Sequence, residues 1–164
     1  MFRNKSRTKY WIIGTILAAA LLLVWGRIAG DSAKAKRTNR EVALACTTDM
    51  ATKFHIHPQL EIIIDGQKQE IPVNIGITNF CMNALHTHDT SGVIHVESPE
   101  KRDFTVADFF AVWGKPFSKD QILDSKADDT HMIKVTVDTV EVDSYENTVL
   151  RDGEKIVISY EIKK

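Results

Sequence analysis

The sequence has only two cysteines among its 164 residues, which excludes a disulfide-rich scaffold and a zinc site made of four thiolates. It also lacks a glycine-rich phosphate loop, a G-x-S-x-G turn and an H-E-x-x-H helix, the motifs of several common enzyme classes. With 43% hydrophobic and 26% charged residues, the composition is that of one folded domain with its own core.

Acidic residues are absent from the first 30 positions, which hold five basic residues. The rest of the chain therefore has 16 basic and 22 acidic residues, a formal charge of -6. Phosphate binding depends on clustered positive charge, so an acidic body without a lysine and arginine stripe argues against nucleic acid as a partner. The sequence does not identify a protein partner.

A long apolar run follows the basic N-terminus. Residues 10–26 are uncharged, and snorkelling of Arg27 extends the run to residues 10–29, about 20 residues and enough to span a bilayer as a helix. Trp11 and Trp25 have the positions of interfacial aromatic residues. We therefore expect residues 1–30 to form a single-pass anchor in the cytoplasmic membrane. The basic residues favour a cytoplasmic N-terminus and an extracytoplasmic C-terminal domain.

The competing interpretation of the same region is a signal peptide. Residues 33–35 form an A-x-A tripeptide, and cleavage there would release the protein as a secreted one. Both interpretations place the body of the protein outside the cytoplasmic membrane, in a compartment where disulfides persist.

Residues 31–40 are small, polar and basic and predict a linker, so the folded domain is expected to span residues 41–164. Alternating hydrophobicity and turn signals in this part are typical of β-structure. The Asp65-Gly66 pair predicts a hairpin turn. The predicted strands cover residues 53–57, 59–64, 67–73, 93–97, 132–142 and 155–162.

One good helix is predicted, beginning after Thr105 with Asp108 at its third position and ending at Gly114. Residues 118–125 predict a second short helix, and residues 41–50 a short helix or an irregular strand. The expected fold is therefore α+β: an N-terminal transmembrane helix followed by a β-rich extracytoplasmic domain of hairpins and one main helix. A β-grasp-like or small-barrel arrangement fits this order of elements.

Histidine is distributed most unevenly, because five of the six histidines lie between His55 and His95. His55 and His57 form an H-x-H pair on a predicted strand and so project from one face; His86 and His88 repeat the spacing. Neutral imidazole is a common ligand of zinc and copper, and a metal site draws its ligands from separated segments. For a shared ion, with metal–nitrogen bonds of about 2 Å, the ring nitrogens must lie within about 8 Å of one another.

The candidate metal ligands, for copper or zinc, are His55, His57, Cys81, His86, His88 and His95. Asp89 and Glu97 are candidates for further ligands or for carboxylates that orient these histidines. In a metal-dependent hydrolase, either could be the general base. A third interpretation is a structural or partner-binding module without metal, in which the histidines hydrogen-bond to loop backbone. His131, far from the others in sequence, is expected to be a surface histidine.

The two cysteines have two mutually exclusive interpretations. Cys46 and Cys81 can form a disulfide, which would stabilise the fold by about 3 kcal/mol for a loop of this length. Alternatively, Cys81 can be a thiolate ligand beside the histidines. Their spacing is not C-x-x-C, so the sequence gives little support to thiol–disulfide exchange chemistry.

The stretch CMNALHTHDTSGVIHVESP, Cys81–Pro99, followed by the helix FTVADFFAVWG, resembles a pattern of uncharacterised bacterial proteins that are membrane-anchored or secreted. The resemblance implies no activity. It implies that one group of residues belongs together: His57, Cys81, His86, His88, Asp89, His95 and Glu97. The resulting hypothesis is a membrane-tethered extracytoplasmic domain that binds a transition metal, for metal handling or a metal-dependent interaction.

Overall fold

The computed structural model describes residues 17–22, 37–49 and 51–163. Residues 17–22 are helical, and no helix among the described residues is long and apolar enough to cross a membrane. The rest of the expected anchor, residues 10–16 and 23–29, and the A-x-A tripeptide lie outside the described residues, so the anchor stays a prediction. Arg37–Lys164 forms one compact unit.

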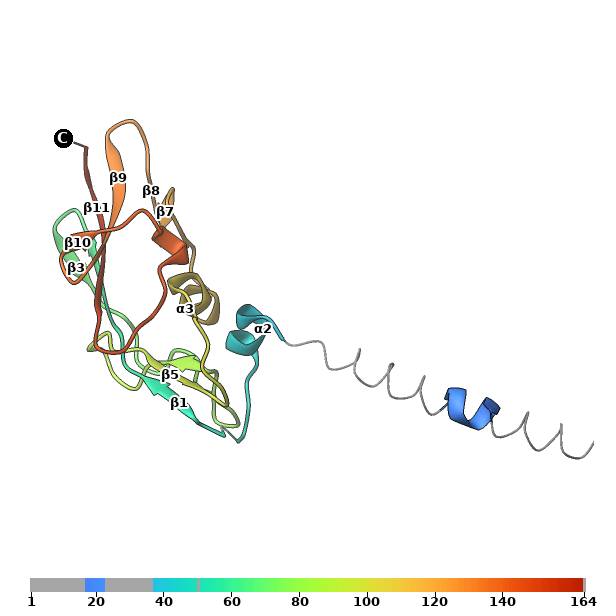
Figure 1. Cartoon of the computed structure of the whole chain (residues 1–164). Coiled ribbons are helices and arrows are strands. Elements are labelled where there is room, and N and C mark those ends of the chain that lie inside the picture. Colours follow the sequence, from blue (N-terminus) through green and yellow to red (C-terminus); the bar gives the residue numbers. More distant parts are fainter. Residues whose placement is uncertain (1–16, 23–36, 50, 164) are drawn as a thin grey trace, which may run out of the picture. The chain divides into compact units, whose positions relative to one another are not determined.

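This unit is an α+β domain rich in strands, as the sequence predicts (Figure 1). Its largest sheet has five strands in the order β10-β9-β11-β2-β3. Their bounds are β2 (Gln59–Ile64), β3 (Gln67–Gln69), β9 (His131–Val137), β10 (Val140–Glu141) and β11 (Lys155–Ile162). The central strands β2 and β11 pair in parallel and all other neighbours pair antiparallel. This parallel pair joins segments that are distant in sequence, and it was not predicted from the sequence.

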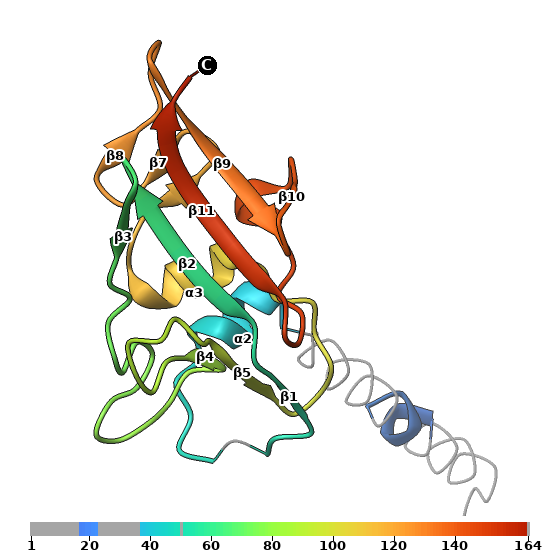
Figure 2. The same ribbon diagram turned by 90° about the vertical axis from the view of Figure 1, so that its left-hand side faces the viewer.

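Helix α3 (Val106–Trp113) covers one face of this sheet (Figures 1 and 2). The helix begins as predicted, because the Asp108 carboxylate accepts a hydrogen bond from the Thr105 backbone N–H at 3.0 Å. It ends at Gly114, whose φ of 70° is the left-handed conformation of a helix C-terminus. The core between helix and sheet holds Phe104, Phe109, Phe110, Leu60, Ile62, Ile133, Val135, Ile156 and Ile158.

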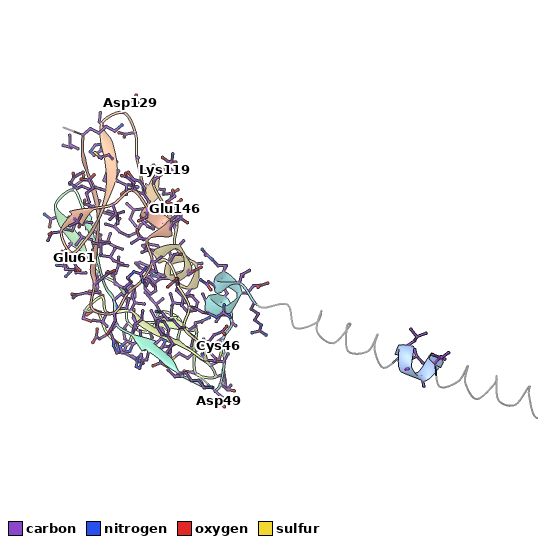
Figure 3. The ribbon with its side chains drawn as sticks, in the orientation of Figure 1. Cys46, Asp49, Glu61, Lys119, Asp129 and Glu146 are labelled. Atoms are coloured by element: carbon purple, nitrogen blue, oxygen red, sulfur yellow. A yellow bond between two sulfur atoms is a disulfide. The ribbon has the colours of Figure 1, made fainter. Side chains whose placement is uncertain are left out.

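The other face of the five-stranded sheet is polar. Glu61 forms ion pairs with Lys68 at 3.3 Å and Lys155 at 3.1 Å. Figure 3 shows Glu61 on the side of the sheet that faces away from α3. In the first part of β2, the polar Gln59 and Glu61 alternate with the buried Leu60 and Ile62, which reflects one exposed and one buried face.

A second, three-stranded antiparallel sheet lies at the end of the large sheet where β2 and β11 begin (Figure 2). Its order is β1-β5-β4, with bounds β1 (Phe54–Ile56), β5 (His95–Ser98) and β4 (Leu85–His86). Ile56, Val96 and Leu85 oppose one another across the strands and are buried in the core. The opposite face of this sheet carries the histidines, as the alternation in the sequence predicts.

Helix α2 (Asn39–Leu44) precedes these strands. The Thr38 side chain accepts a hydrogen bond from the Glu41 N–H at 3.2 Å and caps the helix, so residues 38–40 belong to the folded unit rather than to a linker. Arg40 in α2 forms an ion pair of 2.9 Å with Asp108, which fastens α2 to the start of α3.

Three local expectations are wrong. Residues 118–125 are not a helix but belong to a small sheet, because Ser118 Oγ accepts from the Asp120 N–H in a turn that competes with helix formation. The predicted strand over 132–142 is a hairpin, since Asp138 and Thr139 adopt positive φ and turn the chain. The strand expected over 67–73 ends at residue 69. The strands of the small sheet are β6 (Phe117–Ser118), β7 (Gln121–Ile122) and β8 (Ser125–Lys126).

Candidate metal centre

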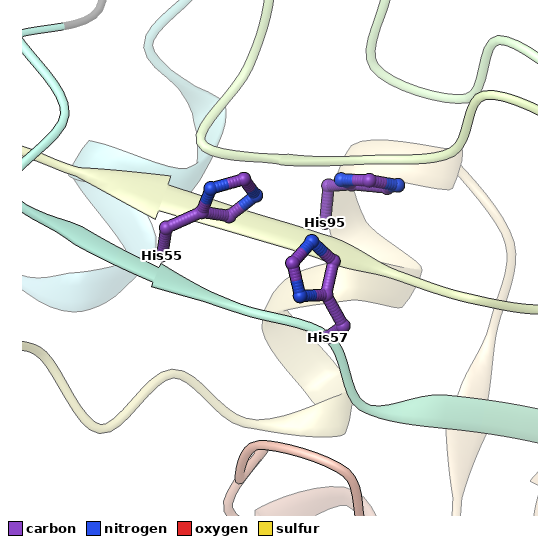
Figure 4. A group of neighbouring side chains, drawn as sticks. All are labelled: His55, His57 and His95. Atoms are coloured by element: carbon purple, nitrogen blue, oxygen red, sulfur yellow. The ribbon is translucent and has the colours of Figure 1, made fainter.

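The first H-x-H pair lies on β1 and at its end, with both imidazoles over one face of the three-stranded sheet (Figure 4). The ring centroids of His55 and His57 are 4.4 Å apart. His95 on β5 stands beside both rings, at 5.8 Å from His55 and 4.7 Å from His57. One nitrogen of each of the three rings lies within 4.8 Å of the others, so these histidines could share one ion. We name them the outer triad.

The second H-x-H pair joins the cluster from the other side of β5. His86 on β4 lies opposite His95 in the antiparallel register, and their rings stack with centroids 5.5 Å apart. His88 contacts His86 at 4.9 Å and His95 at 4.6 Å between ring centroids. These three histidines also bring one nitrogen each to within 4.8 Å of the others. We name His86, His88 and His95 the inner triad, because His86 is fully buried.

The five histidines therefore form two triads that share His95. The separations lie well inside the limit of about 8 Å for ligands of a common ion, and small side-chain rotations bring such nitrogens to bonding distance. His95 occupies the middle because β5 is the central strand of the three-stranded sheet.

His86 has the most informative surroundings. Its Nδ1 lies 3.0 Å from the carbonyl oxygen of Asn83, so Nδ1 carries the proton and donates it. The Nε2 lone pair then points away from this bond, and within the described residues Nε2 is buried without a hydrogen-bond partner. Burial lowers the pKa of His86, which keeps the ring neutral. A buried, neutral imidazole with one nitrogen anchored and the other unpartnered is prepared for a ligand.

The outer histidines are anchored by carboxylates. Glu97, which lies opposite His55 in the strand register, has its Oε1 3.2 Å from His55 Nε2. Asp152 Oδ1 lies 3.9 Å from His57 Nδ1 and accepts a hydrogen bond of 2.9 Å from the His57 backbone N–H. Histidine ligands of metals usually have an oxygen acceptor against the nitrogen that does not bind the ion. In the outer triad, His55 has such an acceptor in Glu97, whereas the ring of His57 lies near Asp152 at a distance longer than a hydrogen bond.

The pKa of His95, the histidine common to both triads, depends on the neighbouring imidazoles. Burial lowers the pKa of His95, and the neighbouring His88, His57 and His55 lower it further when they are protonated. Crowding of imidazoles thus favours the neutral rings that a metal requires.

Two backbone features hold the second H-x-H pair and His95 in place. Thr87, buried between His86 and His88, donates from Oγ1 to the Pro72 carbonyl at 2.8 Å and accepts there from the Ile75 N–H at 3.1 Å. Gly92 has a φ of 87°, and a Cβ at this position would lie 2.2 Å from the Leu60 carbonyl oxygen. The segment that precedes β5 therefore packs closely against β2 at Gly92.

Cys81 is not a ligand. Cys46 and Cys81 form a disulfide with a Cα–Cα distance of 5.4 Å, so the prediction of a Cys81 thiolate is wrong and the disulfide interpretation holds. The sulfur atoms have no charge to offer a metal. The bridge fastens the segment after α2 to residue 81, and paired hydrogen bonds between Thr47 and Met82 continue the connection.

Asp89 lies at the edge of the cluster. Its Oδ1 accepts from the Ser91 N–H at 2.8 Å, and the hydrogen bonds from Ser91 lower its pKa. Protonated His95 and His88 lower this pKa by a smaller amount, which indicates that the carboxylate is near both rings. Glu97 is closer to the role predicted for these acids, since it contacts His55 directly.

Sequence reasoning missed three residues that support the site. The Asn83 carbonyl anchors His86, and the Asn83 side chain donates to the Ala43 carbonyl at 2.9 Å. Thr87 is buried, and its position between two histidines of an H-x-H pair is the signal that could have placed it on the opposite face. Asp152 comes from a turn 95 residues after His57, and no local signal connects the two.

The arrangement as a whole offers nitrogen ligands from three chain segments on one face of a small sheet. Imidazole suits zinc and copper equally, and no thiolate is present among the described residues to favour one of them. No family model, curated protein or solved structure matches this chain.

Proposed function

We propose that this domain binds a transition-metal ion, copper or zinc, through its clustered histidines and serves in metal handling or in a metal-dependent interaction. The observation that carries the proposal is the state of His86, whose Nδ1 is anchored to Asn83 while its buried Nε2 has no partner among the described residues. A polar atom buried without a partner costs about 1–3 kcal/mol, which a bound ion would recover.

The third interpretation, histidines that only hydrogen-bond to backbone, predicts ring nitrogens facing main-chain carbonyls. His86 Nδ1 has such a contact, but the other ring contacts are between imidazoles or with carboxylates. Imidazole rings that converge on one another are expected for ligands of a shared ion. Histidines that only hydrogen-bond to the backbone do not need to converge, so this arrangement supports metal binding.

Hydrolysis is the weaker alternative. Glu97 already contacts His55, and its Oε2 accepts a hydrogen bond of 3.3 Å from the Thr52 hydroxyl. Asp89 is held by Ser91. These partners favour carboxylates that orient histidines over a carboxylate free to take a proton from bound water.

We also propose where the domain is located and which fold its strands form. We infer an anchor in residues 10–29 that tethers the domain outside the cytoplasmic membrane, from the apolar run and its basic flank. The disulfide agrees with an oxidising compartment. The strand order, with a parallel central pair, a hairpin on each side and a helix following the first hairpin, supports a β-grasp-like arrangement over a closed barrel.

Metal analysis of the full-length protein in mild detergent tests the proposal. We expect about one equivalent of zinc or copper to remain after dialysis, and the double variant His57→Ala/His88→Ala, which damages both triads, to retain almost none. His131→Ala is the matched control and should behave like the wild type. If the wild type retains neither metal and neither raises its melting temperature, metal binding is excluded.

A further inference from the structure

The two triads cannot be filled independently, because both need His95. A neutral imidazole has one lone pair available to a metal, and its other nitrogen carries a proton. Binding two ions through one ring requires removal of that second proton. It also places two positive ions about 6 Å apart, since each metal–nitrogen bond is about 2 Å long. A cluster with one shared histidine therefore favours one ion over two.

The two triads differ in their access to solvent. The side chains of His55 and His57 are 42% and 45% exposed. In the inner triad His88 is exposed, but His86 is fully buried, so this triad is the more enclosed of the two. An ion or a donor molecule arriving from solution can reach the H-x-H pair of β1 without any movement of the core. The inner triad contains the anchored His86, whose rotation is restricted, and this favours retention of the ion there.

We propose that the cluster holds one ion at a time in two alternative positions, the exposed outer triad and the more buried inner triad, with His95 as the ligand common to both. This proposal rests on the proposed function and specifies it: the metal is cargo that moves through the site. Transfer proceeds by ligand exchange. The ion stays bonded to the one unprotonated nitrogen of His95 while its bonds to His55 and His57 are replaced by bonds to His86 and His88. The proton on the other nitrogen of His95 stays in place, so no proton or electron need be supplied.

The shared position explains the placement of the rings. Among the described residues, His95 has ring contacts with all four other clustered histidines. His57 contacts only the rings of His55 and His95, and His88 only those of His86 and His95. A site meant only to hold an ion would gather four ligands around one point. Two triads that share His95 instead suit an ion that moves between two neighbouring positions.

Equilibrium dialysis of the full-length protein against Zn²⁺ tests the stoichiometry. We expect one ion per wild-type chain. The single variants His57→Ala and His88→Ala each leave one triad intact, so each should still bind one ion. The affinity should fall only to that of the remaining position, by about twofold if the two positions are equally occupied. The double variant and His95→Gln break both triads and should bind none, while His131→Ala should match the wild type.

The rate of exchange tests the direction of passage. With a chelating dye as the Zn²⁺ source, His57→Ala should slow uptake because the exposed position is lost, and His88→Ala should not. Both substituted side chains are exposed, so loss of folding is not expected, and circular dichroism of each variant checks this.

The outcomes separate the two proposals. Two ions bound simultaneously by the wild type would overturn the shared position and leave metal binding intact. The same holds if either single variant alone abolishes binding, or if His57→Ala changes neither affinity nor rate, because then only one triad operates. A wild type that binds no Zn²⁺ in the dialysis and retains no copper in the metal analysis removes the proposed function and, with it, this inference.

Discussion

Two kinds of histidine occupy opposite ends of the five-stranded sheet. At the far end, His131 has Nδ1 2.7 Å from the Thr130 hydroxyl and Nε2 3.9 Å from the Asp65 carboxylate, and its ring stacks on Tyr160 with centroids 4.9 Å apart. At the near end, His86 has one nitrogen anchored and the other without a partner among the described residues.

The difference shows how a structural histidine can be told from a candidate ligand. At His131 the protein itself supplies a polar group near each ring nitrogen and an aromatic face for the ring, so nothing remains for a metal to complete. In the cluster, the Asn83 carbonyl holds His86 Nδ1, while the buried His86 Nε2 has no hydrogen-bond partner among the described residues and the ring lies against those of His88 and His95. A buried ring nitrogen that the protein leaves without a partner distinguishes this candidate ligand from the structural histidine.

Stabilisation of the fold by bound metal should distinguish the clustered histidines from His131 most strongly. A ligand present at about 1,000 times its dissociation constant stabilises the folded state by about 4 kcal/mol. We expect Zn²⁺ in this excess to raise the free energy of unfolding of the wild type by that amount and to leave His95→Gln unchanged. Urea denaturation of the full-length protein with and without Zn²⁺, with the disulfide intact, measures both values.

His131→Ala is the control for this comparison. Loss of its stacking on Tyr160 should lower stability by about 1 kcal/mol, while the gain from Zn²⁺ should equal that of the wild type. A smaller gain in this variant would mean that the two ends are not independent, and the distinction between them would fail.

Gly92 and Gly66 provide a second contrast between the ends, because both have positive φ and only Gly92 is confined. A Cβ at Gly66 would meet nothing within 4 Å, whereas at Gly92 it would meet the Leu60 carbonyl. We expect Gly66→Ala to cost about 1 kcal/mol from the backbone conformation alone. Gly92→Ala should cost about 3 kcal/mol, because the clash adds to the same strain.

Gly92→Ala should also weaken Zn²⁺ binding, since the displaced segment leads directly to His95. Urea denaturation without metal and equilibrium dialysis with Zn²⁺ give the two quantities. Equal costs for the two alanine variants would show that the chain at Gly92 can move away from β2 freely, and that this approach does not position the cluster.

Glu97 tests whether a carboxylate prepares the outer histidines. Glu97→Gln keeps an oxygen acceptor for His55 but removes the charge, so we expect Zn²⁺ affinity to fall by about tenfold, the lower end of the range for outer partners of metal ligands. Glu61→Gln removes the same charge from the polar face of the large sheet and should leave the affinity unchanged. A similar loss in both variants would assign the effect to net charge instead of contact with His55.

Much of the structure around the clustered histidines could be predicted from the alternation of residue types within single segments. The alternation along residues 93–97 assigned His95 and Glu97 to one face and Ile94 and Val96 to the other, and the burial agrees. Strand faces follow from a period of two residues, so they are readable in one sequence. The same holds for helix α3, whose N-terminal and C-terminal signals lie within its own segment.

The parts that could not be predicted depend on contacts between distant segments. The parallel pairing of β2 with β11 has no signature within either strand, and it is this pairing that brings the turn containing Asp152 against His57. The division of the histidines into two triads likewise depends on β5 lying between β1 and β4. Residue spacing indicated which histidines gather but not that one of them is shared.

The smallest predicted effect concerns the structural end, where Asp128 holds the turn before His131. Its Oδ1 accepts from the Thr130 hydroxyl at 2.8 Å, from the Thr130 N–H at 2.7 Å and from the His131 N–H at 2.8 Å, and these bonds lower its pKa to about 2. A carboxyl with a lowered pKa in the folded state stabilises the fold above its unfolded pKa of about 3.9, and this contribution disappears as the pH falls through about 2.

Asp128→Asn should therefore be less stable than the wild type at about pH 5, and the difference should shrink steadily as the pH falls from about 4 toward 2, the interval between the two pKa values. Asp129→Asn is the matched control for the change in net charge, because Asp129 is the exposed neighbour in the same loop (Figure 3). Urea midpoints across this pH range measure the effect. Zn²⁺ affinity should stay the same in both variants. A difference that persists undiminished at about pH 2 would show that the asparagine disturbs the turn by its shape, because most of the stabilisation by the Asp128 charge is by then lost in the wild type as well.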